Sequence, residues 1–133
     1  MTEDDKIWAT VHRHLQSIFD GDVETYSATT ADDLSLFEWW VTPHRQDGLE
    51  FHRFMIAHRW AGAGANWRYD LLEPRLQRYG DCAVVSYTFM LSTAAEGGIT
   101  HRTHNESRVL VRQDGAWRVV HVHKSPATPG QHP

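Results

Sequence analysis

The chain has 133 residues and a formal net charge of −4 at pH 7 with its histidines neutral, so we expect one domain with a sizeable core. Hydrophobic residues make up 41% of the sequence and aromatic residues 11%, which excludes a disordered chain. The acidic balance disfavours binding to nucleic acids or anionic membranes. No apolar run approaches the ~20 residues of a membrane helix, so neither kind of partner is expected.

The cysteine count and the N-terminus restrict the compartment and the cofactors. Cys82 is the only cysteine, which excludes an internal disulfide and a multi-cysteine zinc site. The first six residues are polar and acidic and lack the basic and apolar zones of a signal peptide. We therefore expect a cytoplasmic protein that carries no cofactor.

The first helix is predicted over residues 4–20, where apolar side chains recur at helical spacing and form one stripe. Thr2 and Asp5 have the spacing of a capping box at its start. Gly21 is a suitable end.

Two shorter helices are predicted before the chain becomes strand-like. Asp22 is a suitable N-cap for a helix over residues 23–28. A third helix is expected over residues 49–60 and ends at a glycine–alanine stretch. One face of this helix carries Leu49, His52, Ile56 and Trp60.

Later in the chain the apolar period changes to two, which is typical of β-strands. A short strand at residues 34–38 precedes residues 39–48, which we expect to be a loop because of Pro43 and a final Asp-Gly. Pro74 is expected to mark a sheet edge or a bulge. Four long strands are predicted over residues 67–76, 82–92, 100–111 and 117–124.

Helices in the first half and successive strands in the second indicate an α+β fold. Three N-terminal helices packed on a strongly curved antiparallel sheet would form a cone with an internal cavity. We expect this single cone domain over residues 1–126 and a proline-rich, disordered tail over residues 127–133.

The turn at Asp114 and Gly115 decides which side chains enter the cavity, because a one-residue slip exchanges the two faces of a strand. A two-residue turn would pair Arg108 with His121. A three-residue loop, with Gly115 in the left-handed region, would pair Arg108 with Val120. The second register is favoured because it groups apolar side chains inside the cone.

This register directs charged side chains into a mostly apolar cavity. A cation there is costly unless it is paired or has an anionic ligand. Two interpretations of Arg108 are therefore open: it holds an acid, or Glu106 or Glu38 neutralises it permanently. The side chains expected on its face are Leu110, Val120, Val122, Arg102, Glu106 and Lys124.

Two further pairs of residues stand out. His121 and His123 share the opposite strand face at a spacing that metals can use, but such pairs also pack at sheet interfaces, and no metal site is predicted. Trp39 and Trp40 are adjacent and cannot both be buried in one strand face. One of them is expected to line the cavity or a dimer contact, with a surface packing pair as the alternative.

Several motifs occur in order along the chain: DGDVETY, LFE, GLEFHRF, ESRV and DGAWRVVHVH. Together they resemble the association (hub) domain of calcium/calmodulin-dependent protein kinase II, within the nuclear-transport-factor-2-like or SnoaL-like superfamily. The resemblance covers residues 7–126. It implies a cone fold, assembly into dimers and rings, and a cavity that binds small carboxylates.

The resemblance also implies a set of binding residues. One family arginine corresponds to Lys124, which keeps the charge but lacks the bidentate fork, and another corresponds to Thr88. Arg102 is a candidate to compensate for this loss. The ligand-binding candidates are His52, Trp60, Arg102, Arg108 and Lys124.

The first functional hypothesis is a stand-alone, oligomeric hub-like domain, a homodimer or a larger ring. Its cavity would bind a small organic acid or an aromatic metabolite. Arg108 and Lys124 would anchor the carboxylate, His52 would supply a hydrogen bond, and Trp60 would act as a gate.

Two alternatives use the same fold. A SnoaL-like or ketosteroid-isomerase-like enzyme would act as an isomerase, dehydratase or cyclase, with Tyr26, Glu38 or His52 transferring protons. Arg102 or Arg108 would then stabilise developing negative charge. A pure oligomerisation scaffold would have an empty or filled cavity.

Overall fold

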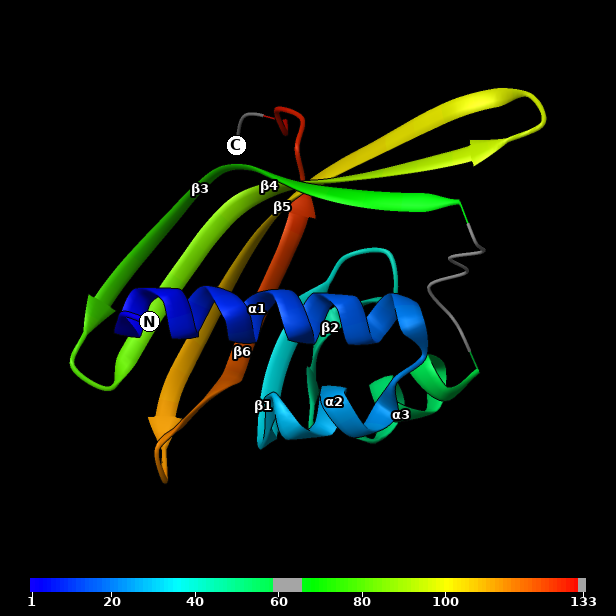
Figure 1. Cartoon of the computed structure of the whole chain (residues 1–133). Helices are drawn as coiled ribbons and strands as arrows, with labels where there is room; N and C mark the ends of the chain where they lie inside the picture. Colours follow the sequence, from blue (N-terminus) through cyan, green and yellow to red (C-terminus); the bar gives the residue numbers. More distant parts are fainter. Residues whose placement is uncertain (59–65, 132–133) are drawn as a thin grey trace.

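The computed structural model describes residues 1–58 and 66–131 and shows helices lying across one face of a curved six-stranded sheet (Figure 1). The helices are α1 (Glu3–Asp20), α2 (Val23–Ala28) and α3 (Glu50–Ala57). The strands are β1 (Thr30–Glu38), β2 (Thr42–Asp47), β3 (Trp67–Tyr79), β4 (Cys82–Ala95), β5 (Gly98–Gln113) and β6 (Ala116–Pro126). Their order in the sheet is β2-β1-β6-β5-β4-β3. The α+β prediction is confirmed.

The first two helices begin and end at the residues that the sequence indicates. The Thr2 hydroxyl accepts from the Asp5 backbone N–H, and the Asp5 carboxylate accepts from the Thr2 backbone N–H, both at 3.1 Å. This is the predicted capping box. Gly21 ends α1 in the left-handed region, with φ of 71°, and Asp22 caps α2 by accepting from the Thr25 backbone N–H.

Replacing Thr2 by alanine is expected to lower the free energy of unfolding by about 1 kcal/mol, because one N-terminal donor of α1 loses its acceptor. Urea unfolding followed by tryptophan fluorescence measures this. Thr2→Ser keeps the oxygen and serves as the control. An equal loss in both variants would contradict a role for the hydroxyl.

The core lies between α1 and the inner face of the sheet. Ile7 and Val11 of α1 are fully buried, as are Val85 of β4, Leu110 of β5 and Val119 of β6. Burial of each such side chain stabilises the fold by ~1.5–3 kcal/mol. No helix in residues 1–58 and 66–131 has the length and apolarity needed to cross a membrane.

Residues 42–47 form a strand, so the prediction of a loop there is wrong. β2 pairs antiparallel with β1, for example Ser35 with Asp47, and lies at the edge of the sheet. An edge strand tolerates Pro43 because one of its sides needs no hydrogen bonds. The expected irregularity at Pro74 is confirmed by a register shift between β3 and β4. One pair, β1 with β6, is parallel, whereas an antiparallel sheet was expected.

The β5–β6 hairpin has a tighter turn than the favoured prediction. Gln113 pairs with Ala116, which leaves a two-residue turn of Asp114 and Gly115. Both turn residues have positive φ, 53° and 78°, as the hairpin turn favoured by Asn-Gly and Asp-Gly requires. The three-residue loop is therefore wrong.

A bulge in β6 then changes the register. Val120 is the extra residue at the point where pairing with β5 shifts. Arg108 consequently pairs with Val122, and neither predicted partner, Val120 or His121, is correct. The charged side chains still point inward, because the real register differs from the favoured one by two residues. Val119 is buried in place of Val120.

Candidate functional site

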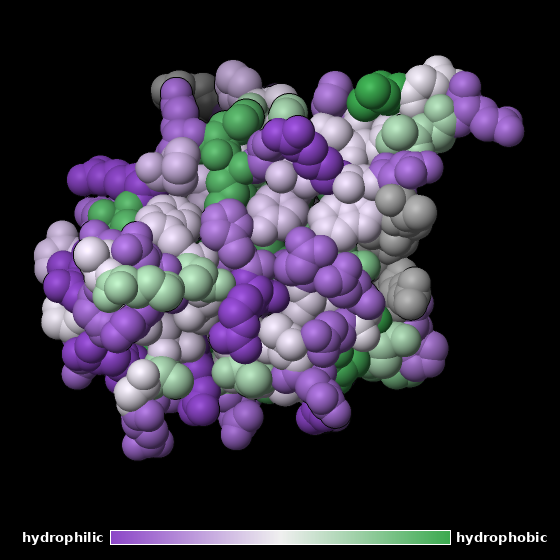
Figure 2. All heavy atoms as spheres, viewed as in Figure 1, coloured by the Kyte–Doolittle hydropathy of each residue, from purple (hydrophilic) through white to green (hydrophobic). Residues whose placement is uncertain are grey.

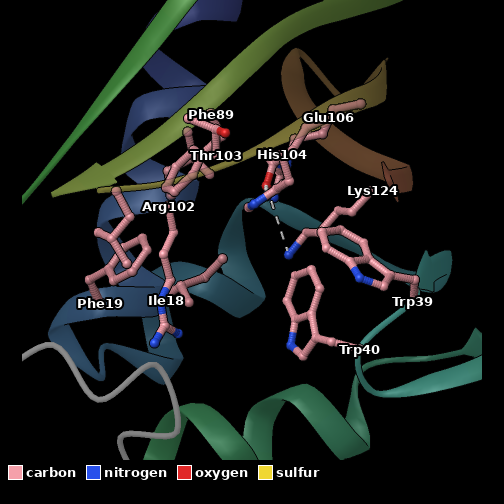
Figure 3. A pocket seen from close by; sticks show the side chains of 13 residues that line it. Ile18, Phe19, Trp39, Trp40, Phe89, Arg102, Thr103, His104, Glu106 and Lys124 are labelled. Atoms are coloured by element: carbon pink, nitrogen blue, oxygen red, sulfur yellow. Dashed lines mark hydrogen bonds and ion pairs between the residues drawn. The ribbon is translucent and has the colours of Figure 1, made fainter. Parts of the chain in front are cut away.

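A cavity of about 710 Å³ opens on the inner side of the sheet, next to α1 and the residues that connect β1 to β2 (Figure 3). Small-molecule sites in proteins have volumes of about 300–1,000 Å³. The walls are mainly aromatic and aliphatic, with charged groups on β5 and β6. The lining residues are Leu15, Ile18, Phe19, Trp39, Trp40, Phe89, Leu91, Arg102, Thr103, His104, Glu106, Arg108 and Lys124.

Arg108 and Glu106 of β5 form a buried ion pair at the cavity wall. Arg108 is only 1% exposed, and its Nη1 also donates to the Tyr87 hydroxyl at 2.6 Å. The Tyr87 hydroxyl donates to Glu106 Oε1 at 2.7 Å. His104 Nε2 donates to Glu106 Oε2 at 2.5 Å. Glu106 is therefore the counter-ion of Arg108, as the second interpretation of this arginine held.

A second buried carboxylate, Glu38, extends this network across the sheet. His52 Nε2 of α3 donates to Glu38 Oε1 at 2.5 Å, and Lys124 Nζ of β6 donates to Glu38 Oε2 at 2.8 Å. Glu38 pairs with Lys124 in the parallel β1–β6 ladder, which brings their side chains together. Lys124 Nζ also lies 4.0 Å from Glu106 Oε2 and joins the two groups.

These pairs keep the buried carboxyls charged. Burial acts to raise the pKa of Glu38, but Lys124 and His52 outweigh it and lower the pKa to about 2. Burial also opposes ionisation of Glu106, while the charge of Arg108 holds its pKa far below the usual range. Burial raises the pKa of Tyr26 well above its ordinary value.

Acid–base catalysis needs a group with a pKa near the working pH, and neither Glu38 nor Tyr26 meets that condition. To transfer protons, Glu38 would need access to the cavity and a pKa raised toward the working pH. In the structure Glu38 is 0% exposed, and its pKa is lowered. The reason is the pair of cationic and hydrogen-bonding partners described above, which outweighs the burial.

The remaining predicted site residues lie apart from the ion pairs. Arg102 lines the cavity, and its side chain extends past Ile18 on the side opposite Lys124 (Figure 3). Tyr26 is buried with its ring centroid 6.5 Å from that of His52. Trp60 lies outside the described residues.

Tyr87, Phe89 and His104 were missed at the sequence level. Tyr87 and Phe89 are buried on the inner face, whereas Thr88 between them bonds Asn105 across the outer side of β4 and β5 at 2.7 Å. Thr88 is therefore not a cavity position, and the inward residue next to it is Phe89. Strict alternation along β4 is the signal that identifies it.

Both adjacent tryptophans line the cavity. Trp39 and Trp40 follow the last residue of β1, so strand alternation no longer separates them. Their rings meet edge to face with centroids 4.6 Å apart, and the side chains are 43% and 45% exposed. The Lys124 ammonium lies 5.1 Å from the Trp40 ring centroid, within cation–π range.

Helices over one face of a curved sheet, with a cavity between them, define the nuclear transport factor 2-like class. A superfamily protein of this class from Salmonella enterica matches with a TM-score of 0.73 at 21% identity, over 95% of this chain and 92% of that chain. This likeness shows the shared fold. Within the class, the sequence model of the calcium/calmodulin dependent protein kinase II association domain matches residues 3–128. The chain belongs to this association-domain family.

Individual relatives agree with that assignment. The chain is 28% identical over 113 residues to calcium/calmodulin-dependent protein kinase type II subunit delta of Oryctolagus cuniculus. The match covers 84% of this chain and 21% of the relative, so the chain spans about a fifth of that kinase. The association domain of C. elegans CaMKII matches with a TM-score of 0.81 and 28% identity, over 92% of this chain and 95% of that chain. The resemblance found in the sequence motifs is confirmed.

Proposed function

We propose that the chain is a self-associating hub-type domain whose cavity binds a small organic acid or an aromatic metabolite. Membership of the association-domain family supports the self-association. The observation that carries the self-association is the middle of the sheet's outer face, where β4, β5 and β6 present no Asp, Glu, Lys or Arg.

The outer face lies on the side of the sheet away from α1 and α3 (Figure 1). The helix-bearing side is mainly hydrophilic, with apolar residues in small patches (Figure 2). Side chains without a full charge cost less to desolvate than Asp, Glu, Lys or Arg, which suits a self-complementary contact between two copies. Across the central strands this face carries Val84, Ser86, Thr88, Asn105, Ser107, Val109, His121 and His123.

Replacing Val109 by arginine is expected to disrupt the assembly. Val109 lies in the middle of this face, between Val84 and His121. A two-fold interface would bring two copies of the new charge together without counter-ions. Light scattering after size-exclusion chromatography should show a loss of the oligomer, with helix and strand content unchanged by circular dichroism.

Gln113→Arg is the matched control for this test. It adds the same charge at the exposed end of β5, beside the hairpin turn, and should leave the oligomer intact. A monomeric wild-type protein at concentrations of tens of micromolar would contradict self-association. Equal loss of the oligomer in both variants would contradict the outer face as the contact.

The cavity supports the ligand-binding half of the proposal. It combines a volume of about 710 Å³ with aromatic walls and a cationic rim, the features of a site for a small, partly apolar anion. Because its carboxylates stay ionised and paired, binding is favoured over proton-transfer chemistry. A ligand of this class should raise the midpoint of thermal unfolding, since it binds the folded state alone.

A further inference from the structure

We infer that the cavity selects a flat aromatic molecule with a single negative charge, and that Arg102 binds that charge. The inference rests on the proposed ligand-binding function and specifies its ligand class. It departs from the assignment implied by the family resemblance, in which Arg108 and Lys124 anchor the ligand.

Among the residues that the structure describes, one basic side chain that lines the cavity has no carboxylate partner. Three basic side chains line the cavity. Two of them, Arg108 and Lys124, are paired with the carboxylates of Glu106 and Glu38. Arg102 is the third basic side chain, and among the described residues no carboxylate pairs with it. A monoanion compensates its charge, whereas a dianion would bring one charge with no partner.

Arg108 and Lys124 are already committed to the protein. Arg108 is ion-paired with Glu106, and Lys124 Nζ lies 2.8 Å from Glu38 Oε2. Turning either cation toward a ligand would break a buried ion pair, which is strongly destabilising. Neither is free to supply the main anion contact.

Arg102 is in a different position. Within residues 1–58 and 66–131 it forms no ion pair with a carboxylate, and residues 59–65 contain no Asp or Glu. Its guanidinium reaches past Ile18 into the open part of the cavity (Figure 3). A guanidinium presents two parallel N–H groups to a carboxylate. Arg102 can therefore bind an anion without breaking an existing pair.

The walls favour a flat ring over an aliphatic chain. Phe19 and Phe89 stack with centroids 6.0 Å apart and an interplanar angle of 7°, and His104 stacks on Phe89 at 5.1 Å. Trp39 and Trp40 line the other side (Figure 3). An aromatic guest can pack against these faces in offset or edge-on geometry.

Four probes separate charge from shape: naphthoate, its neutral amide naphthamide, a naphthalenedicarboxylate dianion, and the aliphatic monoanion octanoate. Isothermal titration calorimetry on the full chain measures their affinities. Naphthoate should bind at least about tenfold more tightly than each of the others, the difference expected from one charge-assisted contact or one lost stacking surface.

Arg102→Gln assigns the contact. It should weaken naphthoate binding at least about tenfold and leave naphthamide binding unchanged, so that the two probes become similar. A purely structural role for Arg102 would weaken both probes alike. Arg118→Gln is the matched control, because Arg118 lies by a separate pocket on β6, and it should bind naphthoate like the wild type.

Equal wild-type affinity for naphthoate and naphthamide would overturn the charge selection while leaving ligand binding in place. Octanoate binding as tightly as naphthoate would overturn the aromatic selection. Failure of all four probes to bind would overturn the inference and the ligand half of the proposed function together. Self-association is scored independently by light scattering, so its failure is distinguishable from each of these results.

Discussion

Replacing Glu106 by glutamine is expected to lower the free energy of unfolding by about 3–5 kcal/mol, the cost of removing one partner of a buried ion pair. Glutamine preserves the shape of the side chain but not its charge. Arg108, 1% exposed, would be left buried with neutral hydrogen-bond acceptors and no anionic partner, and His104 would lose its carboxylate partner. Urea unfolding at one fixed protein concentration, followed by tryptophan fluorescence, measures the change.

Two further variants make this result specific. Asp47→Asn breaks the exposed Arg45–Asp47 pair and should cause no measurable loss, because solvent screens such pairs. Glu106→Gln combined with Arg108→Met removes the buried charge together with its partner and should recover part of the lost stability. A loss below about 1 kcal/mol in Glu106→Gln would show that Arg108 has another effective counter-ion.

Helix ends were predictable because their signals are local. Gly21 and the capping pair Thr2 and Asp5 act within one turn of α1, so the sequence alone defines their geometry. β2 was missed for the opposite reason. It is a polar, proline-containing segment that becomes a strand only by pairing with β1, and no local pattern reports a partner strand.

The hairpin register shows a limit of periodicity. Val119 and Val120 are both apolar, so hydrophobicity cannot decide which of them points inward. The turn type could be matched to Asp114 and Gly115, but the bulge at Val120 depends on how β6 meets β5 and β1 together. The charged side chains nevertheless point inward as predicted. The tighter turn and the bulge each shift the register by one residue, and a total shift of two returns each side chain to the same strand face.

The site was predicted as a set of residues but not as a network. Glu38 and Lys124 are 86 positions apart in the chain, and only the parallel pairing of β1 with β6 brings them together. Burial of Glu38 acts to raise its pKa. The lowered pKa follows from Lys124 and His52, whose approach depends on the folded topology.

Acidification from about pH 8 to about pH 5.5 is expected to destabilise the fold through His14. This histidine is 1% exposed, and its Nδ1 lies 3.2 Å from the Thr29 hydroxyl and 3.1 Å from the Thr30 hydroxyl. Burial, with a smaller effect of Arg108 and of Lys124, holds its pKa well below the ordinary 6.5. The folded protein therefore keeps His14 neutral at a pH where the unfolded chain is protonated.

The direction of the effect follows from that difference. Below pH 6.5 the unfolded state binds a proton that the folded state excludes, so stability is complete above this pH and falls below it. The loss approaches ~1.4 kcal/mol per pH unit for one such group. Glu38 and Glu106 contribute in a lower window, because their pKa values are depressed from 4.5 and their stabilisation is lost only as pH falls below that value.

His14→Gln separates this contribution from the other histidines. Glutamine can still hydrogen-bond the two threonine hydroxyls but does not titrate, so the variant should lose less stability than the wild type between about pH 6.5 and 5.5. His44→Gln replaces an exposed histidine of β2 and should keep the wild-type slope. Unfolding is measured at constant protein concentration, because self-association would also shift the apparent stability. Equal slopes in wild type and His14→Gln would contradict the buried histidine as the source of acid sensitivity.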